Sequence, residues 1–261
     1  MNKIATLKVG LLANILLAVF AFKQQDKPTL YLVGDSTVAG GWGKFVHQYF
    51  DTTKVSVQNC AVSGTSSRTY YTSISHDEAL RKKGMWRVLK AKLKPGDVVL
   101  IQFGHNDDGP IDDLQRSRGS LKGNGEDTVS IINHFSGERE IVHSYGWYLA
   151  RFISEAKAKG ATAVICSPIP KDQWKDGKIQ RVSEGYGKWA RTAAERNNAP
   201  FLDLNSTLAD IYDKEGAKAT ARYFTEDHVH PSTQGGMLGA QAVINYIGSN
   251  QTLNIRPYLK P

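Results

Sequence analysis

Short apolar runs occur at five places along the chain, and each has a length expected for a β-strand. Runs of about four to eight apolar residues, bounded by turn-forming residues, are typical of strands buried in a sheet. One of the five alternates apolar and polar residues, and the others are nearly continuous. We predict strands at 30–33, 55–62, 98–103, 162–166 and 199–204.

Between these strands, apolar residues recur at helical spacing. One helix is predicted to begin near Gly40 or Gly41, and the last one follows Pro231-Ser232. Strands that alternate with helices form a parallel sheet covered on both faces, so the pattern predicts an α/β fold. The other helices are predicted at about 80–93, 148–156 and 181–197.

Residues 108–144 do not follow this alternation. The segment is polar and rich in Gly, Arg and Asp, and it alternates like a β-hairpin around Phe135-Ser136-Gly137-Glu138. A long excursion after a strand end is more often functional or mobile than structural. The chain shows no internal repeat and no second domain, so we interpret the segment as an insertion in one domain spanning 22–261.

The first 21 residues have the features of a secretory signal peptide. Lys3 and Lys8 precede an apolar stretch at 9–22, and Val19-Phe20-Ala21 ends in a small residue suited to cleavage. The alternative is an uncleaved anchor, but the apolar stretch is shorter than the roughly 20 residues that a membrane span needs. No Cys lies near residue 21, which argues against a lipoprotein. We therefore expect a secreted or periplasmic protein without stable membrane insertion.

The chain is basic, with a formal charge of +8 that falls to +6 when Lys3 and Lys8 are removed. A basic protein favours anionic partners. The Lys and Arg residues are not clustered with interleaved aromatic residues, the pattern typical of nucleic-acid binding. We expect an acidic polysaccharide as partner, no nucleic acid, and a monomer.

Candidate chemistry begins where the first predicted strand ends, at Gly34-Asp35-Ser36. Ligands of open α/β sheets bind at the carboxyl ends of the strands, and a helix is predicted just beyond. A Ser in this position is often only a turn or cap residue. Two other motifs fail on spacing: a nucleophile elbow needs Gly where this chain has Val38, and a dinucleotide fingerprint needs Gly at Val46.

Other strand ends add groups that suit a serine hydrolase. The first three predicted strand ends place Ser36, Gly64 and Asn106 at one edge of the sheet, and Asp227 and His230 follow near the C-terminus. A serine hydroxyl needs a neighbouring base. An Asp three residues before a His can orient its ring. The backbone N–H groups of Ser36 and Gly64 and the Asn106 amide could stabilise an oxyanion.

Four sequence blocks in this order resemble those of the GDSL or SGNH hydrolases, a flavodoxin-like esterase superfamily. They are GDST at 34–37, AVSG at 61–64, GHND at 104–107 and DHVH at 227–230. The finer pattern resembles rhamnogalacturonan acetylesterases, including Thr37 where many members have Leu. The resemblance implies a three-layer α/β/α fold with five parallel strands in the order 2-1-3-4-5. It also implies Ser36 as nucleophile, His230 as base and acid, Asp227 as its orienter, and no cofactor.

Neighbouring residues allow other interpretations. His228 could be the base, although the Asp-x-x-His spacing selects His230. A metal site could be drawn from Asp227, His228, His230, His105 and Asp107, but the implied fold needs no metal. Asp35 is interpreted as a turn or cap residue. Several residues on or near the active edge could together hold an acidic sugar chain, although each alone is typical of solvated surface: Arg68, Arg116, Arg118, Lys171 and Trp174.

The sequence therefore predicts an exported esterase that removes acetyl groups from pectic polysaccharide. Alternatives are an acetylxylan esterase, a lipase or thioesterase, an acyltransferase, and a carbohydrate-binding relative without chemistry. A lipase needs a long apolar channel, which the polar insertion does not suggest. A non-catalytic relative is disfavoured because Ser36, Asn106, Asp227 and His230 are all present.

Cys60 and Cys166 are the two cysteines, and export would suggest a disulfide between them. In the implied strand order, two strands separate the strands that carry them. At about 4.8 Å per strand the separation is roughly 14 Å, beyond the about 7 Å limit for a disulfide. We expect two free, buried thiols.

Overall fold

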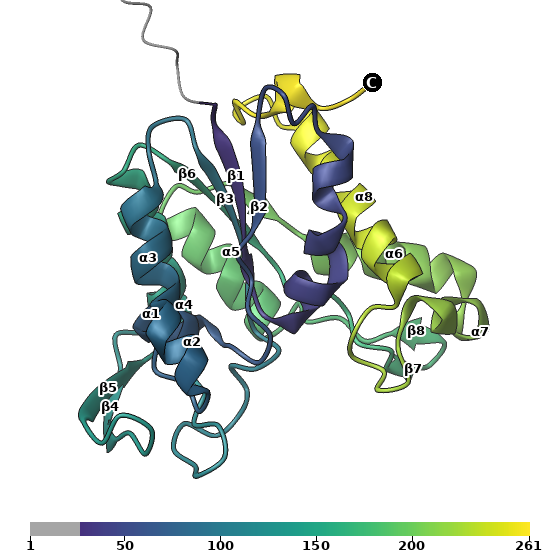
Figure 1. Cartoon of the computed structure of the whole chain (residues 1–261). Helices are drawn as coiled ribbons and strands as arrows, with labels where there is room; N and C mark the ends of the chain where they lie inside the picture. Colours follow the sequence, from purple (N-terminus) through teal and green to yellow (C-terminus); the bar gives the residue numbers. More distant parts are fainter. Residues whose placement is uncertain (1–26) are drawn as a thin grey trace, which may run out of the picture.

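The computed structural model describes residues 27–261 and contains a parallel five-stranded sheet in the order β2-β1-β3-β6-β9. The predicted order 2-1-3-4-5 is confirmed, because these are the five sheet strands in sequence order. Figure 1 shows the sheet between two layers of helices. The strands are β1 (Thr29–Gly34), β2 (Ser56–Asn59), β3 (Val98–Gln102), β6 (Thr162–Cys166) and β9 (Phe201–Leu202).

One face of the sheet is covered by the helices that lie between β2 and β9 in the sequence. Their aromatic residues, among them Tyr70, Trp86 and Phe152, pack against β1 and β3 side chains such as Val33 and Ile101. The predicted helix at 80–93 is two helices, because Gly84 has φ +63° and breaks it. The helices of this layer are α1 (Ser67–Thr72), α2 (Glu78–Lys83), α3 (Met85–Lys92), α4 (Tyr145–Lys157) and α5 (Tyr186–Arg196).

The other face is covered by the segment after β1 and by the C-terminal helices. The segment after β1 begins directly after Ser36 as a short π-helix, earlier than predicted, and continues as two 3-10 turns. Its glycines disfavour a regular helix but permit close packing, since a Cβ on Gly41 would lie 2.6 Å from Pro231. The elements are η1 (Thr37–Gly41), η2 (Trp42–Lys44), η3 (Val46–Tyr49), α6 (Leu204–Glu215), α7 (Ala217–Thr220), η4 (Ala221–Tyr223), α8 (Thr233–Ser249) and η5 (Arg256–Tyr258).

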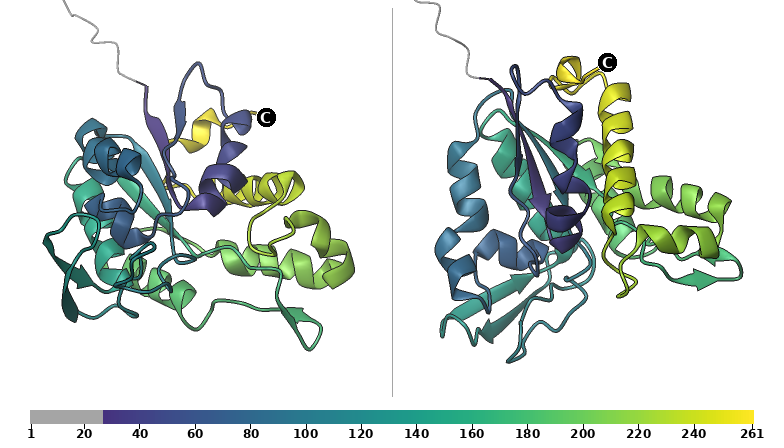
Figure 2. Two further views of the ribbon diagram at one scale, coloured as in Figure 1. Left: turned by 60° about the horizontal axis from the view of Figure 1, so that its bottom comes forward. Right: turned by 45° about the vertical axis from the view of Figure 1, so that its right-hand side comes forward.

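Two antiparallel hairpins extend the sheet edge at which the strands end. The predicted hairpin of the insertion is confirmed as β4 (Thr128–Ile132) and β5 (Arg139–His143). A second one, β7 (Trp174–Lys175) and β8 (Lys178–Ile179), was not predicted. Figure 2 shows β4–β5 on the side of α1 and α4, and β7–β8 on the side of α6. Both hairpins therefore lie at the edge of the sheet where the active site was predicted.

The N-terminal prediction lies outside this structure. Residues 1–21, interpreted as a signal peptide, are not among the described residues, and cleavage and export stay predictions. Within residues 27–261, no helix combines the length and apolar character that a membrane crossing requires.

Both cysteines are free, as predicted. Cys166 is buried in β6, whereas Cys60 is only half-buried just beyond β2, so the expectation of two buried thiols is wrong for Cys60. We expect titration of the denatured, unreduced protein to find two thiols, and only Cys60 to react rapidly in the native protein. Finding none would indicate a bridge between molecules.

Candidate active site

Ser36 lies at the carboxyl edge of the sheet in a cavity of about 420 Å³. β1 ends at Gly34 and delivers Ser36, which precedes the π-helix and is only partly buried. The loops after β2 and β3 deliver Gly64 and Asn106 to the same cavity, and the loop before α8 delivers His230. The structure thus brings together the residues selected from the four sequence blocks. The remaining lining residues are Thr37, Ser63, His105, Arg116, Arg118, Lys171 and Val229.

His230 lies between Ser36 and Asp227. Its Nε2 is 2.7 Å from the Ser36 Oγ. Its Nδ1 is hydrogen-bonded to the Asp227 carboxylate. A carboxylate accepts a hydrogen bond, so the Nδ1 carries the proton and the Nε2 is left to accept the hydroxyl proton of Ser36. This tautomer is the one a serine nucleophile requires.

The Asp-x-x-His segment folds as a tight loop around the Asp227 carboxylate. Asp227 Oδ1 accepts hydrogen bonds from the backbone N–H groups of His230 (2.9 Å) and Val229 (3.0 Å), and from the Thr225 hydroxyl (2.8 Å). The backbone and side-chain hydrogen bonds of His230, with those of Val229 and Thr225, hold the pKa of Asp227 well below its ordinary value. The carboxylate therefore stays ionised and fixes both the loop and the ring.

His228 points away from Ser36. Its Nδ1 lies 2.8 Å from the Asp172 Oδ2, and its backbone carbonyl accepts a hydrogen bond from the Asp172 N–H. The Trp174 Nε1 donates to the other oxygen of Asp172. His228 therefore anchors the loop to the segment after β6. Trp174 does not line the cavity at Ser36, and its contact with substrate stays a prediction.

Three hydrogen-bond donors at the cavity are available to an oxyanion. The backbone N–H groups of Ser36 and Gly64 donate to no residue within 27–261. Gly64 has φ +80°, a conformation that a side chain would strain. The Asn106 Nδ2 donates one hydrogen to the Thr65 carbonyl at 2.7 Å and has a second one free.

Three cations complete the cavity. The insertion supplies Arg116 and Arg118, and the segment after β6 supplies Lys171. The Arg118 Nη1 donates to the Gly64 carbonyl at 3.2 Å. None of the three forms an ion pair with any other residue that the structure describes. The cavity therefore holds three cations that form no ion pair with a described residue, while the carboxylates of Asp35, Asp107 and Asp113 act on Arg118 from a longer distance.

Comparison with known proteins agrees with this geometry. Residues 32–237 match the GDSL-like lipase/acylhydrolase family. The chain belongs to this family. It is 28% identical over 222 residues to a rhamnogalacturonan acetylesterase from Emericella nidulans, covering 84% of each chain. It is 24% identical to a rhamnogalacturonan acetylesterase from Bacillus subtilis, covering 82% of this chain and 87% of the relative. The protein is therefore an ester-cleaving hydrolase.

Solved structures extend the comparison to the fold. An acetylxylan esterase from Geobacillus stearothermophilus superposes with a TM-score of 0.56 at 20% identity. The match covers 85% of this chain and 95% of the other. The two proteins share the α/β architecture.

The residues beneath Ser36 in this esterase form a chain that the sequence did not assign. The fully buried Asp35 accepts hydrogen bonds from the Thr37 N–H (2.9 Å) and hydroxyl (2.7 Å). The Thr37 hydroxyl accepts from Gln102, whose amide oxygen accepts from the Trp42 ring. Burial acts to raise the pKa of Asp35, but His105 and the Thr37 hydrogen bonds outweigh it and lower the pKa. Thr37 thus has a polar role that Leu could not fill.

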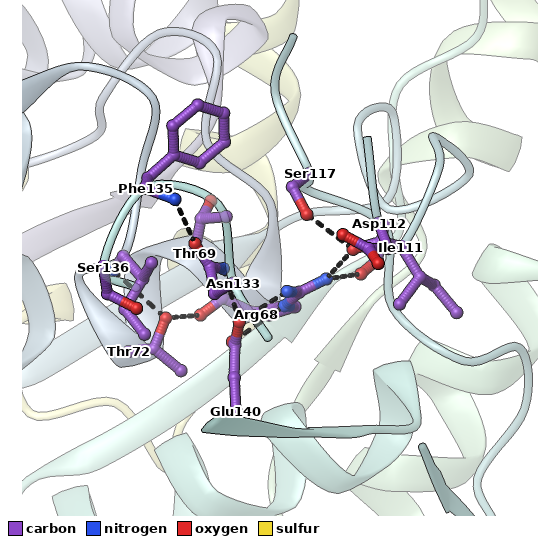
Figure 3. Close-up of polar contacts among 12 residues, drawn as sticks. Arg68, Thr69, Thr72, Ile111, Asp112, Ser117, Asn133, Phe135, Ser136 and Glu140 are labelled. Carbon is purple, nitrogen blue, oxygen red and sulfur yellow. Dashed lines mark hydrogen bonds and ion pairs between the residues drawn. The ribbon is translucent and has the colours of Figure 1, made fainter. Parts of the chain in front are cut away.

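Arg68 is the clearest correction among the predicted substrate residues. It is fully buried and binds both oxygens of Glu140 on β5, at 2.9 and 2.5 Å. Its Nη1 donates to the carbonyls of Ile111 (2.7 Å) and Gly119 (2.8 Å). Figure 3 shows Glu140 and the Ile111 carbonyl meeting the guanidinium of Arg68. Arg68 therefore holds the insertion, including the loop that carries Arg116 and Arg118, and is not available to substrate.

The residues considered for a metal have separate partners. His228 contacts Asp172, and His105 donates from Nε2 to the Ile169 carbonyl at 3.1 Å. Asp107 is buried among hydrogen bonds from Ser67 and Ser120. Burial raises the pKa of Asp107 to about 6. Among the described residues, no three such side chains converge as metal ligands.

Proposed function

We propose that this esterase is exported and removes O-acetyl groups from an acidic pectic polysaccharide, rhamnogalacturonan being the best fit. The observation that carries the proposal is the cavity at Ser36, which combines the nucleophile arrangement with the three unpaired cations. Galacturonate-containing polymers carry a carboxylate on each acidic sugar. The planar guanidinium of Arg binds both carboxylate oxygens at once.

The proposed reaction follows from the hydrogen bonds at Ser36. His230 Nε2 takes the proton of the Ser36 hydroxyl as the Oγ attacks the acetyl carbonyl carbon. The oxyanion accepts hydrogen bonds from the N–H groups of Ser36 and Gly64 and from the Asn106 amide. The sugar oxygen leaves with the proton from His230, and Ser36 keeps the acetyl group. Water then attacks the acyl-serine as His230 takes its proton. The Ser36 Oγ leaves with that proton, and acetate is released.

The openness and polarity of the cavity support a polymeric substrate. The side chains of His230 and Asp227 are 42% and 49% exposed, so a long chain can lie across them. Among the described residues that line the cavity, Val229 alone has an apolar side chain of any size. A lipase needs an apolar surface for the acyl chain, and the lining of this cavity does not provide one.

The relatives differ in the polysaccharide that they are named for. Two are rhamnogalacturonan acetylesterases, and one solved structure is an acetylxylan esterase. Xylan is the second candidate because the fold is shared. The unpaired charges of Arg116, Arg118 and Lys171 favour the acidic polymer, since a neutral backbone offers nothing to bind them.

Replacing Arg116 by Ala tests the substrate assignment. We expect KM on acetylated rhamnogalacturonan to rise about tenfold, and turnover of a small neutral acetyl ester to stay nearly unchanged. Added salt should weaken only the polymer reaction, because screening acts on exposed charges. Arg118→Ala is a less clean probe because its guanidinium also contacts the Gly64 carbonyl.

Arg87→Ala is the matched control, since this exposed arginine lies on α3, away from the cavity. It should leave both reactions unchanged. Equal losses on both substrates in the Arg116 variant would indicate a structural role for the loop. A wild-type preference for acetylated xylan would contradict the pectin assignment and leave the esterase mechanism intact.

The pH profile tests the proton transfer. Only the neutral ring of His230 can accept the Ser36 proton. We expect kcat/KM to fall on acidification, by about tenfold per pH unit where a single protonation limits the rate. Asp227, with its lowered pKa, remains ionised as the pH falls and adds no second pH dependence. A flat profile down to about pH 4 would contradict His230 as base.

Protonation of Asp107 at low pH does not destabilise the folded state, so it does not complicate the pH profile. Its pKa in the folded protein is about 6, above the ordinary 3.8. The folded state therefore binds the proton more tightly than the unfolded state between these values. Acidification through this window favours the folded state as far as Asp107 is concerned, and the cost of ionising it applies only at higher pH. Measuring the unfolding transition at each pH shows that the protein stays folded over the range of the activity profile.

A further inference from the structure

His105 is a histidine at the active-site cavity that the proposed reaction does not use. Its side chain is only 6% exposed, although it lines the cavity. It directly precedes Asn106, the side-chain oxyanion donor, just as Asp35 directly precedes the nucleophile Ser36. The strand before it, β3, lies between β1 and β6 in the sheet. His105 is therefore placed to contact the loops that follow both neighbouring strands.

The two ring nitrogens of His105 face acceptors on these two loops. The Nε2 donates to the Ile169 carbonyl, in the loop after β6, at 3.1 Å. The Nδ1 lies 3.5 Å from the Oδ2 of Asp35, directly after β1. Both the Nδ1 and this Oδ2 are enclosed, and neither forms a hydrogen bond with any residue of 27–261. Enclosed polar atoms without partners are costly, so these two atoms must satisfy each other or remain unsatisfied.

The hydrogen bond to Ile169 determines where the first proton of the ring lies. A carbonyl oxygen only accepts, so the Nε2 carries a proton. With that proton alone, the Nδ1 would present a lone pair to the carboxylate of Asp35, and the contact would be repulsive. A second proton, on the Nδ1, makes the ring an imidazolium and the contact an ion pair. The 3.5 Å separation suits an ion pair, although it is longer than a good hydrogen bond.

Asp35 supplies the negative charge that this imidazolium requires. The residue is fully buried, and its Oδ1 accepts hydrogen bonds from the Thr37 N–H and hydroxyl. Burial acts to raise the pKa of Asp35, but His105 and the Thr37 hydrogen bonds lower it overall. Buried charges are retained in proteins when they are paired. The ionised carboxylate and the protonated ring thus stabilise each other.

Other charged groups surround His105, which lines both the active-site cavity and an adjoining one of about 180 Å³. The cationic or titratable side chains that share these cavities with it are Arg116, Arg118, Lys171, Arg181, Tyr186 and His230. Asp108 is paired with Lys122 at 2.9 Å, and the buried Asp107 follows in the same loop. The cations disfavour a further positive charge. Among the described residues, Asp35 is the carboxylate at ion-pair distance from the ring and offsets them.

We infer that His105 is a positioning residue: as an imidazolium paired with Asp35, it holds the nucleophile segment beside the oxyanion segment. The inference rests on the proposed serine mechanism and adds a second proton to it. His230 must be neutral to act as base, whereas His105 must be charged to hold Asp35. At alkaline pH His105 loses its Nδ1 proton and the contact with Asp35 becomes repulsive. The donors and the nucleophile then separate, and the rate falls.

Asp35→Asn tests the second proton, because it makes the charge unnecessary. The amide oxygen can still accept from Thr37, and the amide N–H can donate to the Nδ1 of a neutral His105. We expect wild-type kcat/KM on a small neutral acetyl ester to fall at alkaline pH as well as at acid pH. The Asn variant should keep kcat within about tenfold of wild type, the difference between a charged and a neutral hydrogen bond. Its kcat/KM should show no alkaline fall.

These profiles are corrected for uncatalysed ester hydrolysis, and the unfolding transition is measured at each pH. The absence of an alkaline fall in the wild type, or an equal fall in the wild type and Asp35→Asn, would overturn the inference. Neither result would affect the serine mechanism. Wild-type turnover in Ser36→Ala would remove that mechanism and the positioning role with it.

His105→Leu removes the contacts to both loops. We expect kcat on the small ester to fall about 100-fold with little change in KM, as for a displacement of about 1 Å between reacting groups. His47→Leu is the matched control, since this exposed histidine lies on η3 and its ring forms no hydrogen bond with a described residue. Lower unfolding stability with wild-type kcat in His105→Leu would contradict the positioning role. If this variant does not fold, the Asp35→Asn profiles still decide.

Discussion

Replacing Ser36 by Ala is expected to lower kcat/KM on every ester by about four orders of magnitude or more and to leave the protein folded. The Ser36 Oγ is the group that His230 Nε2 contacts at 2.7 Å, and Ala offers no atom to form the acyl-enzyme. When a nucleophile that acts as a unit with its base is lost, only oxyanion stabilisation and binding remain. Initial rates on a small acetyl ester and on acetylated polysaccharide measure the effect.

Ser63→Ala provides the matched control for the same cavity. Ser63 is exposed there, and its hydroxyl forms no hydrogen bond to any described residue. Its loss should change activity by less than about tenfold. The Ser36 variant should unfold at nearly the wild-type temperature, because a partly exposed hydroxyl contributes little to stability. Wild-type turnover in the Ser36 variant would exclude the serine mechanism.

The sheet and the edge that carries Ser36 could be predicted because their determinants are local. Four of the five predicted strands are nearly continuous apolar runs and one alternates, and turn-forming residues such as Gly34 and Gly104 mark where strands end. Parallel strands place all their carboxyl ends on one edge. Finding Ser36, Gly64 and Asn106 in one cavity therefore followed from the strand ends, with no knowledge of long-range contacts.

Arg68 could not be placed in the same way. Its partner Glu140 is 72 positions further along the chain. An arginine after a strand end is usually exposed, and nothing near it in the sequence marks it as buried. Burial is possible because one side chain contacts both carboxylate oxygens and two backbone carbonyls, leaving little of the charge unsatisfied.

The segment after Ser36 shows a different limit. Apolar spacing from Trp42 to Phe50 predicted a helix, but glycines and tertiary packing decided its form. The role of Thr37 depends on Gln102, which belongs to β3 and looked like an ordinary strand residue. Thr37 and Gln102 are each a polar residue beside an apolar run near a strand end, which is a signal in the sequence. Their contact with each other became identifiable only when β1 and β3 were placed side by side.

Replacing Asn106 by Ala is expected to lower kcat by about 100- to 1,000-fold, with a small change in KM. The Asn106 amide is buried at the cavity, with one hydrogen held by the Thr65 carbonyl at 2.7 Å and the other free for an oxyanion. Charge on the substrate oxygen develops in the transition state, so the lost donor acts mainly on kcat. Removing one oxyanion donor typically costs about 3 kcal/mol of transition-state stabilisation.

A structural role for Asn106 predicts a different pair of measurements. Loss of its bond to Thr65 leaves a buried carbonyl without a partner, and that costs about 1–3 kcal/mol of folding free energy. If Asn106 served only to hold the loop, denaturant unfolding would show this loss while kcat on a small acetyl ester stayed near the wild-type value. Asn106→Asp adds a second check. It keeps the size of the side chain but replaces the donor with a carboxylate that repels the oxyanion. Its kcat should therefore be as low as that of the Ala variant or lower, and recovery of activity in Asn106→Asp would contradict the oxyanion role.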